Sequence, residues 1–381
     1  MSDIKSHFSP TELARYARHF AIPEFGMEAQ LKLKRSKVLV IGAGGLGSPL
    51  LLYLAAAGVG HLGIVDFDRV DDSNLQRQVL YTVDDIGKSK AIRASERLRE
   101  LNPHIEITAY PEPLSTDNAL ELFNQYDVVA DGTDNFPTRY LVNDACVLTG
   151  KVNVYASIFR FEGQVSVFNF PEKDGERGPN YRDLFPEPPP PGMVPSCAEG
   201  GVLGVLPGII GSLQANEVIK VITGVGEPLS GRLFLFDAAS FTTRTLQVGK
   251  RPDTRIEKLI NYEEFCGMVP NAAVKTISVS ELRNWQAVTK EVQLIDVREL
   301  HEYEVFNIGG ELIPLSQIES AVSRIATDRP VVIYCQSGKR SAQAIERLQA
   351  LQPFDNLLNL EGGIIAWINL VGQLNDSHPR I

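Results

Sequence analysis

A cysteine near the end of the chain lies in a setting that favours thiolate chemistry. Cys335 follows the apolar run "RPVVIY", which predicts a buried strand, and the pattern after it predicts a helix. A short loop before a helix turns backbone N–H groups inward, and such a nest stabilises a thiolate. The spacing C-x-x-x-x-R makes a tight cup that suits sulfur better than phosphate. The alternative is an inert buried thiol at a strand end. The loop residues are Gln336, Ser337, Gly338, Lys339 and Arg340.

Glycines near the other end of the chain have the pattern of a nucleotide site. The run "KVLVIG" predicts a buried strand, and small residues over 45–58 predict a helix. Glycines between them allow close approach to phosphates, although they could also serve only to pack the helix on the strand. Asp66 ends the next strand, where a carboxylate can reach a ribose hydroxyl. Taken alone, this motif favours NAD or FAD and a dehydrogenase. The glycines are Gly42, Gly44, Gly45 and Gly47.

Charged side chains beyond these glycines favour a triphosphate instead. Asn74 and Arg77 follow the second predicted strand, Lys90 begins a helix, and Asp134 follows the strand in "YDVVADGTDN". Cations and a strand-end carboxylate together can neutralise a triphosphate and hold Mg²⁺. Any one of these residues alone could equally form a surface ion pair.

The elements that must position these residues alternate between strand and helix. This order predicts a parallel, doubly wound sheet up to about Arg160. Antiparallel strands follow in "GQVSVFNF", "GRLFLFDAAS" and "TRTLQVG", on either side of a long helix near 208–223. We therefore expect an α/β fold, with a Rossmann-like, mostly parallel sheet and an antiparallel extension. A helix that Ser9 caps should precede it and run through Tyr16 and Arg18.

The length of the chain and a polar stretch within it predict two domains. With 381 residues it exceeds one typical core. A polar, weakly patterned stretch over 249–273 predicts a linker between a domain at 1–248 and a small α/β domain at 274–381.

Bulk properties exclude some functions and suggest a compartment. The net charge of −10 argues against a nucleic-acid binder, and no apolar run is long enough to span a membrane. Four cysteines, widely spaced, favour the reducing cytoplasm over a disulfide scaffold.

Residues 10–248 resemble the ubiquitin-activating-type adenylyltransferases of sulfur-carrier activation, the MoeB/ThiF enzymes of molybdopterin and thiamine biosynthesis. The motifs "GAGGLGSP", "LAAAGVGHLGIVDFDRVDDSNLQRQ", "GKSKA" and "GIIGSLQANEVIK" carry the likeness. The resemblance implies ATP, Mg²⁺ and a small ubiquitin-fold carrier protein that ends in Gly-Gly. Its terminal carboxylate would attack the α-phosphate and form an acyl-adenylate.

The resemblance also assigns roles. It implies that Asp66 holds the ribose, that Asp134 binds Mg²⁺ and that Arg18 reaches into the site of a neighbouring subunit in a homodimer. Asn74, Arg77 and Lys90 would hold phosphates, with Arg77 and Lys90 acting in catalysis.

Residues 274–381 resemble a rhodanese domain through "LIDVRELHEYEVFNIGGELIPL", "VVIYCQSGKRS" and "LEGGIIAW". The resemblance implies that Cys335 carries a persulfide, supplied by a donor such as a cysteine desulfurase or thiosulfate. One departure is "NIGG" from Asn307, where the family often has a His-Ile-Pro-Gly turn.

Two further expectations concern the other cysteines. Cys197, in a proline-rich loop where the adenylyltransferase family has a cysteine, would attack the adenylate or receive sulfur, unless it is an inert thiol. The family often has two C-x-x-C pairs that bind zinc. Here Asn180 to Asp183 occupy the first pair and Cys266 stands alone at the second, so we expect no structural zinc.

Together these features predict adenylylation of a sulfur carrier, then sulfur transfer from Cys335 to give a thiocarboxylate. One alternative is a modifier-activating enzyme that forms a protein thioester, with the rhodanese unit as a docking module. The carrier and its pathway stay open among molybdopterin, thiamine and cysteine synthesis and tRNA thiolation.

Overall fold

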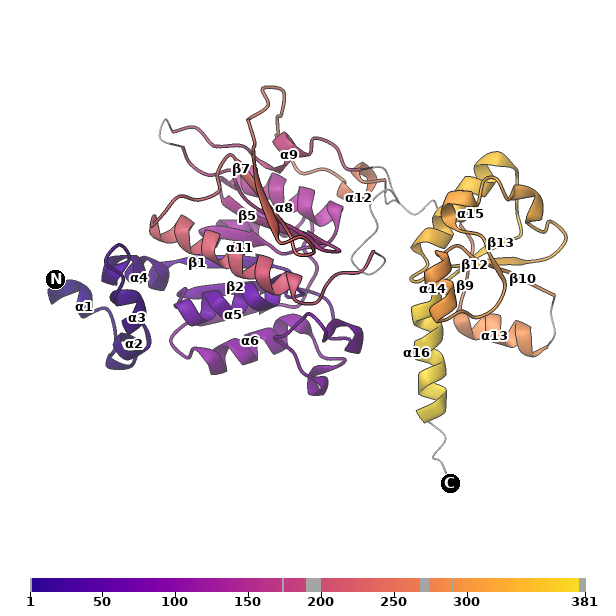
Figure 1. The fold of residues 1–381 in the computed structure, drawn as a ribbon, viewed down its shortest axis with the longest axis horizontal. Coiled ribbons are helices and arrows are strands. Elements are labelled where there is room, and N and C mark those ends of the chain that lie inside the picture. The colour runs from indigo at the N-terminus through magenta and orange to yellow at the C-terminus, as the bar shows by residue number, and fades with distance from the viewer. Residues whose placement is uncertain (1, 173–174, 190–199, 268–273, 289–290, 377–381) are drawn as a thin grey trace. The chain divides into compact units, whose positions relative to one another are not determined.

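The computed structural model describes residues 2–172, 175–189, 200–267, 274–288 and 291–376. Contacts between backbone positions divide the chain into two compact units, 1–268 and 269–381 (Figure 1). Each unit has its own sheet and its own core, and each is described separately below.

The first unit is built on an eight-stranded sheet with the order β3-β2-β1-β4-β5-β6-β7-β8. The strands from β3 to β5 are parallel, and β6, β7 and β8 extend the sheet in antiparallel fashion. The strands are β1 (Lys37–Ile41), β2 (His61–Val65), β3 (Glu106–Tyr110), β4 (Val128–Asp131), β5 (Val152–Phe159), β6 (Glu162–Phe168), β7 (Arg232–Asp237) and β8 (Thr242–Gln247).

Helices cover both faces of this sheet, which is why its central strands are apolar at nearly every position. In β1, Val38 and Val40 point into one core, and Leu39 and Ile41 point into the other. The first core packs under α5 (Gly47–Ala57), α6 (Lys90–Leu101) and α11 (Leu206–Thr223); Figure 1 shows α5 and α11 side by side. The second packs under α7 (Ala119–Asn124) and α8 (Phe136–Thr149).

Short helices precede the sheet. They are α1 (Ser2–Lys5), α2 (Pro10–Arg15), α3 (Ala17–Phe20) and α4 (Gly26–Arg35). Ser9 caps α2 as expected, but the helix stops at Tyr16 instead of continuing through Arg18. Tertiary contacts account for the break, because the buried Tyr16 hydroxyl accepts a hydrogen bond from Asn102 at 2.8 Å and its ring packs on Gly58.

The stretch expected as a linker packs on the first unit as far as residue 267. Its short helix α12 (Tyr262–Phe265) lies against α8, as does α9 (Tyr181–Leu184) from the region of the expected C-x-x-C departure. Tyr262 and Arg182 both bind the buried carboxylate of Asp144, at 2.8 Å in each case. A polar cluster of distant residues thus holds this segment in place.

The second unit has a five-stranded parallel sheet, in the order β11-β10-β12-β13-β9. Its strands are β9 (Thr276–Ile277), β10 (Gln293–Asp296), β11 (Glu311–Leu312), β12 (Val331–Tyr334) and β13 (Leu357–Leu360). One core lies under α15 (Lys339–Leu351), and the other lies under α13 (Val279–Ala287) and α16 (Gly363–Asp376). The short helix α14 (Leu300–Val305) follows β10.

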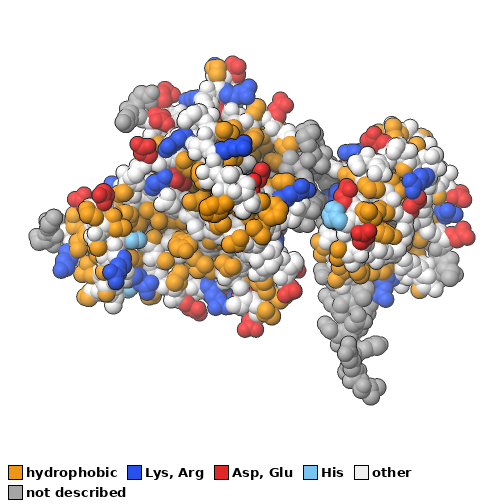
Figure 2. Space-filling model, in the orientation of Figure 1, with side chains coloured by type: hydrophobic (Ala, Val, Ile, Leu, Met, Phe, Trp, Pro, Cys, Tyr) orange, Lys and Arg blue, Asp and Glu red, His pale blue; other side chains and the backbone are white. Residues whose placement is uncertain are grey.

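The predicted fold class is confirmed: a mostly parallel sheet with an antiparallel extension is joined in one chain to a smaller parallel α/β unit. Over the described ranges no helix is both long and apolar enough to cross a bilayer. On the face drawn in Figure 2, Lys and Arg side chains are scattered among Asp and Glu and form no continuous basic area.

Candidate active sites

The glycine turn after β1 is as tight as the sequence indicates. Gly42 has φ +91°, and a Cβ atom there would lie 3.1 Å from the carbonyl oxygen of Gly132. A Cβ atom on Gly47 would overlap the carbonyl oxygen of Gly42. Since α5 begins at Gly47, its N-terminal N–H groups face the space at the carboxyl ends of β1 and β4.

Asp66, at the end of β2, is bound to this turn. Its Oδ2 accepts a hydrogen bond from Ala43 N at 2.7 Å, and its Oδ1 accepts one from Asp68 N at 2.8 Å. Burial raises the pKa of Asp66. Tyr81 supports the turn from the other side, because its buried hydroxyl donates to Ala43 O at 2.8 Å. Sequence reasoning missed Tyr81, since no motif links it to the glycines.

The segment after β2 folds back onto the glycines. The Cγ atom of Arg77 lies 3.6 Å from where a Cβ on Gly45 would be. Asn74 ends a 3₁₀ turn over Asp72–Asn74, and its carbonyl oxygen accepts from Arg77 N at 3.1 Å. Arg77 therefore lies beside the turn, with Asn74 one turn before it.

Lys90 begins α6 and is buried, yet its ammonium group has a counter-ion. Its Nζ lies 3.1 Å from Asp68 Oδ2, and its backbone N donates to Asp68 O at 3.0 Å. Asp68 was not predicted as a site residue, although "DFD" places it two residues from Asp66 on the same loop. The pair holds a positive charge close to the Asp66 carboxylate, which Lys90 also stabilises electrostatically.

The loop after β4 joins the same region. Gly132 N donates to Ile41 O at 2.9 Å, which fastens this loop to the end of β1. Asp131 Oδ1 accepts from the Thr133 hydroxyl at 2.6 Å and shapes the turn that presents Asp134 to solvent.

The structure thus brings together the glycine turn, Asp66, Arg77, Lys90 and the loop of Asp134 at one edge of the sheet. Arg18 lies elsewhere. It is on α3, and Tyr16, two residues before it, packs at the C-terminal end of α5, about 16 Å of helix from Gly47. Cys197 lies outside the described residues.

In the second unit, Cys335 is fully buried at the end of β12. Gly338 has φ +90° and donates its backbone N–H to Cys335 Sγ at 3.1 Å. The loop's outer carbonyl groups meet the start of α16, since Ile364 N donates to Cys335 O at 2.9 Å and Ile365 N donates to Gln336 O at 3.1 Å. With these carbonyls turned outward, the loop can present N–H groups to the sulfur.

Two ion pairs brace this loop. Arg340 makes two hydrogen bonds of 2.7 Å to the carboxylate of Glu302 on α14, which balances its charge. Arg298 is buried and paired with Asp296, with Nη1 3.4 Å from Gln336 Oε1. Lys339 is exposed, and Gln336 and Ser337 are half-buried.

The side chain of Asn307 holds the unusual "NIGG" turn in place. Asn307 Oδ1 accepts from Gly309 N at 3.1 Å, and Gly309 O accepts from the Tyr334 hydroxyl at 2.7 Å. The turn is therefore tied to β12, the strand that ends at Cys335.

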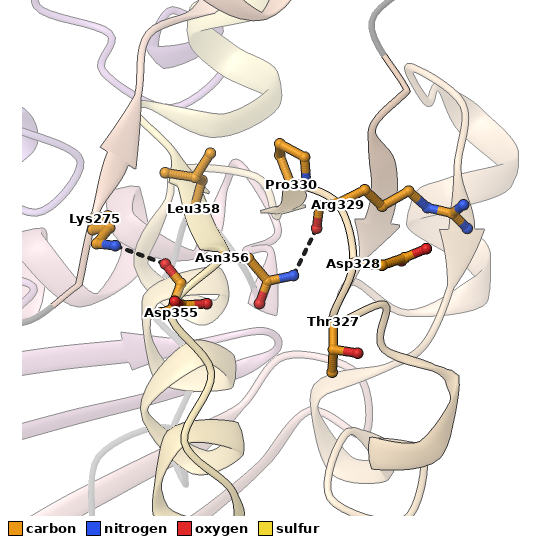
Figure 3. A pocket seen from close by; sticks show the side chains of 8 residues that line it. All are labelled: Lys275, Thr327, Asp328, Arg329, Pro330, Asp355, Asn356 and Leu358. Carbon is orange, nitrogen blue, oxygen red and sulfur yellow. Dashed lines mark hydrogen bonds between the residues drawn. The ribbon is translucent and has the colours of Figure 1, made fainter.

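A hollow of about 320 Å³ lies at the opposite edge of this sheet (Figure 3). Lys275 donates to Asp355 O and Asn356 donates to Arg329 O, at 2.7 and 2.6 Å, so these polar groups are occupied in holding the strand ends together. It is a separate feature from the thiol loop. Among the described residues, no group of three or more His, Cys, Asp or Glu could hold a metal ion.

Comparison with known proteins agrees with both halves of this geometry. The family model described as the ThiF family matches residues 16–258. The chain belongs to the ThiF family. A second model, the rhodanese-like domain, matches residues 278–370. The resemblances inferred from the motifs are thereby confirmed.

Two relatives of this ThiF-family chain match it over more than nine-tenths of its length, and a third matches about two thirds of it. It is 51% identical over 371 residues to the probable adenylyltransferase/sulfurtransferase MoeZ of Mycobacterium tuberculosis, covering 95% of this chain and 94% of that protein. It is 42% identical to the adenylyltransferase and sulfurtransferase MOCS3 of Drosophila sechellia, over 93% and 83% of the two chains. The sulfur carrier protein adenylyltransferase of Thermus thermophilus is 54% identical over 68% of this chain and 97% of its own length.

A solved structure has the same fold as the first unit. E. coli MccB crystallised with ATP matches 65% of this chain and 75% of its own, with a TM-score of 0.55 and 23% identity. The relatives named above establish that this protein is an enzyme with an adenylyltransferase domain and a sulfurtransferase domain.

Proposed function

We propose that this enzyme adenylylates the C-terminal glycine of a ubiquitin-fold sulfur carrier with ATP, and then supplies sulfur from a persulfide on Cys335 to give a thiocarboxylate. The observation that carries the proposal is that one chain contains both a tight glycine turn with Arg77 beside it and the Lys90–Asp68 pair nearby, and a buried cysteine whose sulfur accepts the Gly338 N–H. An enzyme with only one of the two activities would not need the other site.

In the first step, the carrier carboxylate attacks the α-phosphorus of ATP and pyrophosphate leaves. The first N–H groups of α5 would donate hydrogen bonds to phosphate oxygens, and Asp66 would accept hydrogen bonds from the ribose. Arg77 and Lys90 would balance charge as pyrophosphate departs, with Lys90 exchanging Asp68 for a phosphate oxygen.

Mg²⁺ fits this donor set. It commonly keeps several waters and binds through one or two carboxylates together with substrate phosphates. The exposed carboxylate of Asp134, on the loop fastened to β1, would hold it there. Bound Mg²⁺ would neutralise phosphate charge. Asp134 needs no cage of protein ligands for this role.

In the second step, sulfur reaches the adenylated carrier. Cys335 attacks the outer sulfur of a donor such as thiosulfate or a desulfurase persulfide and becomes a persulfide. The terminal persulfide sulfur then attacks the carrier carbonyl and displaces AMP. A second thiol, which we propose is Cys197, then attacks the Cys335 sulfur of the resulting acyl disulfide. The S–S bond breaks, the thiocarboxylate leaves, and a new disulfide forms between Cys335 and the second thiol, which a cellular thiol must reduce before the next turnover. We also propose that the enzyme acts in the cytoplasm and needs no structural zinc.

The test separates the two activities. Arg77→Ala or Asp134→Ala should lower ATP–pyrophosphate exchange, measured with a panel of Gly-Gly carriers, by roughly 10²–10³, as single donor deletions do in other active sites. Arg244→Ala, on the exposed edge strand β8, is the charge-matched control for Arg77→Ala.

Cys335→Ala should leave exchange intact and abolish persulfide formation and carrier thiocarboxylate, which mass spectrometry detects. Arg77→Ala should do the reverse and retain sulfur transfer from thiosulfate to a small thiol. Thiocarboxylate formed at the wild-type rate by Cys335→Ala would contradict the proposal. A carrier thioester as the end product would favour conjugation instead.

A further inference from the structure

A buried hydroxyl group next to the Cys335 loop can donate a hydrogen bond to the sulfur atom. Ser341, in the first turn of α15, is fully buried, with Oγ 3.4 Å from Cys335 Sγ. The same Oγ lies 2.6 Å from Oδ1 of Asn359 on β13, which is only 8% exposed. Three residues from a strand end, a helix and a neighbouring strand therefore meet at one buried point.

A serine hydroxyl has one hydrogen, and here it has two acceptors. An amide Oδ1 can only accept, so the 2.6 Å contact requires that Ser341 donates to Asn359. In that arrangement Ser341 turns oxygen lone pairs toward the sulfur, which suits a protonated thiol that can donate. A thiolate is an acceptor, and it calls for the hydroxyl hydrogen to turn from Asn359 to Sγ.

We propose that Ser341 is the switchable donor to the sulfur of Cys335, and that Asn359 is the positioning residue that takes the hydrogen whenever the sulfur is protonated. This rests on the proposed function of Cys335 as the sulfur-carrying residue, and deepens it.

The donor acts at both steps of sulfur transfer. In loading, the Cys335 thiolate attacks the outer sulfur of thiosulfate, the S–S bond of thiosulfate breaks, and sulfite leaves with the electron pair. In unloading to a small thiol, the acceptor thiolate attacks the outer sulfur of the persulfide. The S–S bond to Sγ breaks and its electron pair returns to Cys335 as a thiolate. Sγ is negative before the first step and after the second, and Ser341 donates to it in both states.

Burial makes this donor hard to replace. Over the described residues, Sγ has two hydrogen-bond donors, Gly338 N–H and the Ser341 hydroxyl, and Cys335 is buried. The nearby charged groups are the pairs Arg340–Glu302 and Arg298–Asp296, and the exposed Lys339 and Glu361.

The experiment measures iodoacetamide labelling of the full-length protein across a pH series, by mass spectrometry of the peptide that contains Cys335. Ser341→Ala should move the midpoint of labelling upward by about one pH unit or more, the size expected for a lost hydrogen bond to an anion. Ser341→Thr, which keeps the hydroxyl, should stay near the wild type. Asn359→Leu removes the competing acceptor and should move the midpoint downward.

Opposite shifts from two buried neighbours are a signature that loosened packing would not produce. Tryptophan fluorescence checks that each variant is folded, because Trp285 and Trp367 both belong to the second unit. Ser341→Ala should also slow sulfur transfer from thiosulfate to a small thiol. Unchanged midpoints, or shifts in the same direction, would overturn this inference. The proposed role of Cys335 would still stand if the wild-type protein transferred sulfur. Sulfur transfer by Cys335→Ala would instead overturn the proposed function.

Discussion

Gly47 illustrates how little space the glycine turn after β1 leaves. Its missing side chain allows α5 to start directly behind the carbonyl group of Gly42. Gly208, in the first turn of α11, is a matched glycine without this constraint, because a Cβ atom there would meet nothing within 4 Å.

Gly47→Ala should therefore weaken both folding and nucleotide binding. Overpacking of this kind costs about 1–3 kcal/mol of unfolding free energy, and any relief must come from a shift of the turn itself. Gly208→Ala should be neutral or slightly stabilising, because alanine is the better helix former. Urea unfolding and ATP binding measured on both variants check this. Equal behaviour of the two would contradict the steric argument.

Local patterns predicted residues that act through backbone geometry, but not their distant partners. The glycines, Asp66 and Cys335 each lie in a strand–turn–helix segment that a short stretch of sequence defines. The hydrogen bonds from Tyr81 to Ala43 and from Ser341 to Asn359 join residues 38 and 18 positions apart, and only folding reveals them.

At the scale of elements, α9 and α12 both pack on α8, and they contain or adjoin the two positions, Asn180 to Asp183 and Cys266, from which we expect no structural zinc. Arg182 makes two bonds of 2.8 Å to Asp144, and its guanidinium lies 4.6 Å from the ring centre of Phe265. Tyr262 adds a third bond to Asp144. Burial raises the pKa of Cys266 to about 11, so its thiol is neutral at pH 7 when no metal ion is bound.

Arg182→Ala should destabilise the first unit by about 3–5 kcal/mol, because it leaves the carboxylate of Asp144 buried without its partner. Tyr262→Phe removes one hydrogen bond to that charge and should cost roughly 1.5–3 kcal/mol. Urea unfolding followed by circular dichroism measures both.

Purified protein should contain no zinc by elemental analysis, and a chelator should leave its melting temperature unchanged. Stoichiometric zinc would refute this account.

The Arg340–Glu302 pair should make the second unit sensitive to acid. Burial alone would raise the pKa of Glu302, but its hydrogen bonds to Arg340 and Glu299 N hold it below the ordinary value of 4.5. The stabilisation is therefore present above pH 4.5 and is lost as the pH falls through the lower, folded-state pKa.

Glu302→Gln should lower the unfolding free energy at neutral pH by roughly 1–3 kcal/mol, and the gap from the wild type should close in acid. Urea titrations followed by tryptophan fluorescence monitor this unit selectively. Glu304→Gln, at an exposed position on the same helix, is the control. A gap that persisted in acid would show that charge is not the cause.

Residues 316–326 have the sequence pattern of a helix but form no α-helix, for a reason outside their own sequence. The run "SQIESAVSRIA" has helical spacing, yet the chain makes two 3₁₀ turns, Leu315–Gln317 and Val322–Arg324. Gln293 on β10 donates to Arg324 O and accepts from Ala326 N, at 2.8 and 2.7 Å. These backbone groups would otherwise continue a helix, so a tertiary contact overrides the local pattern.

At the scale of the whole molecule, Arg18 tests the proposed homodimer. The adenylyltransferase resemblance implies that Arg18 serves the site of a second copy, and in its own subunit it lies by the far end of α5 from the glycine turn. The Arg18→Ala and Arg77→Ala variants should each be inactive alone. In a heterodimer of one subunit of each, both changes fall in the same active site, and the other active site is intact.

Remixing these variants after mild dissociation should therefore recover roughly a quarter of wild-type pyrophosphate exchange, since half the dimers are mixed and each has one intact site. An equal mixture of Arg77→Ala with Asp134→Ala is the control, because both changes belong to the same subunit's site. Recovery there, or none with Arg18→Ala, would contradict the assignment.

The strand order of the second unit has a consequence during synthesis on the ribosome. β9 opens this unit, yet its parallel partner is β13, the last strand to be made. At about 5–20 residues per second, the nascent chain waits several seconds between the two. The first unit, complete by then, can fold while the second is still being translated. Cys335 is itself made only late in that interval, and until Asn359 and the start of α16 follow it, neither is present to order its loop.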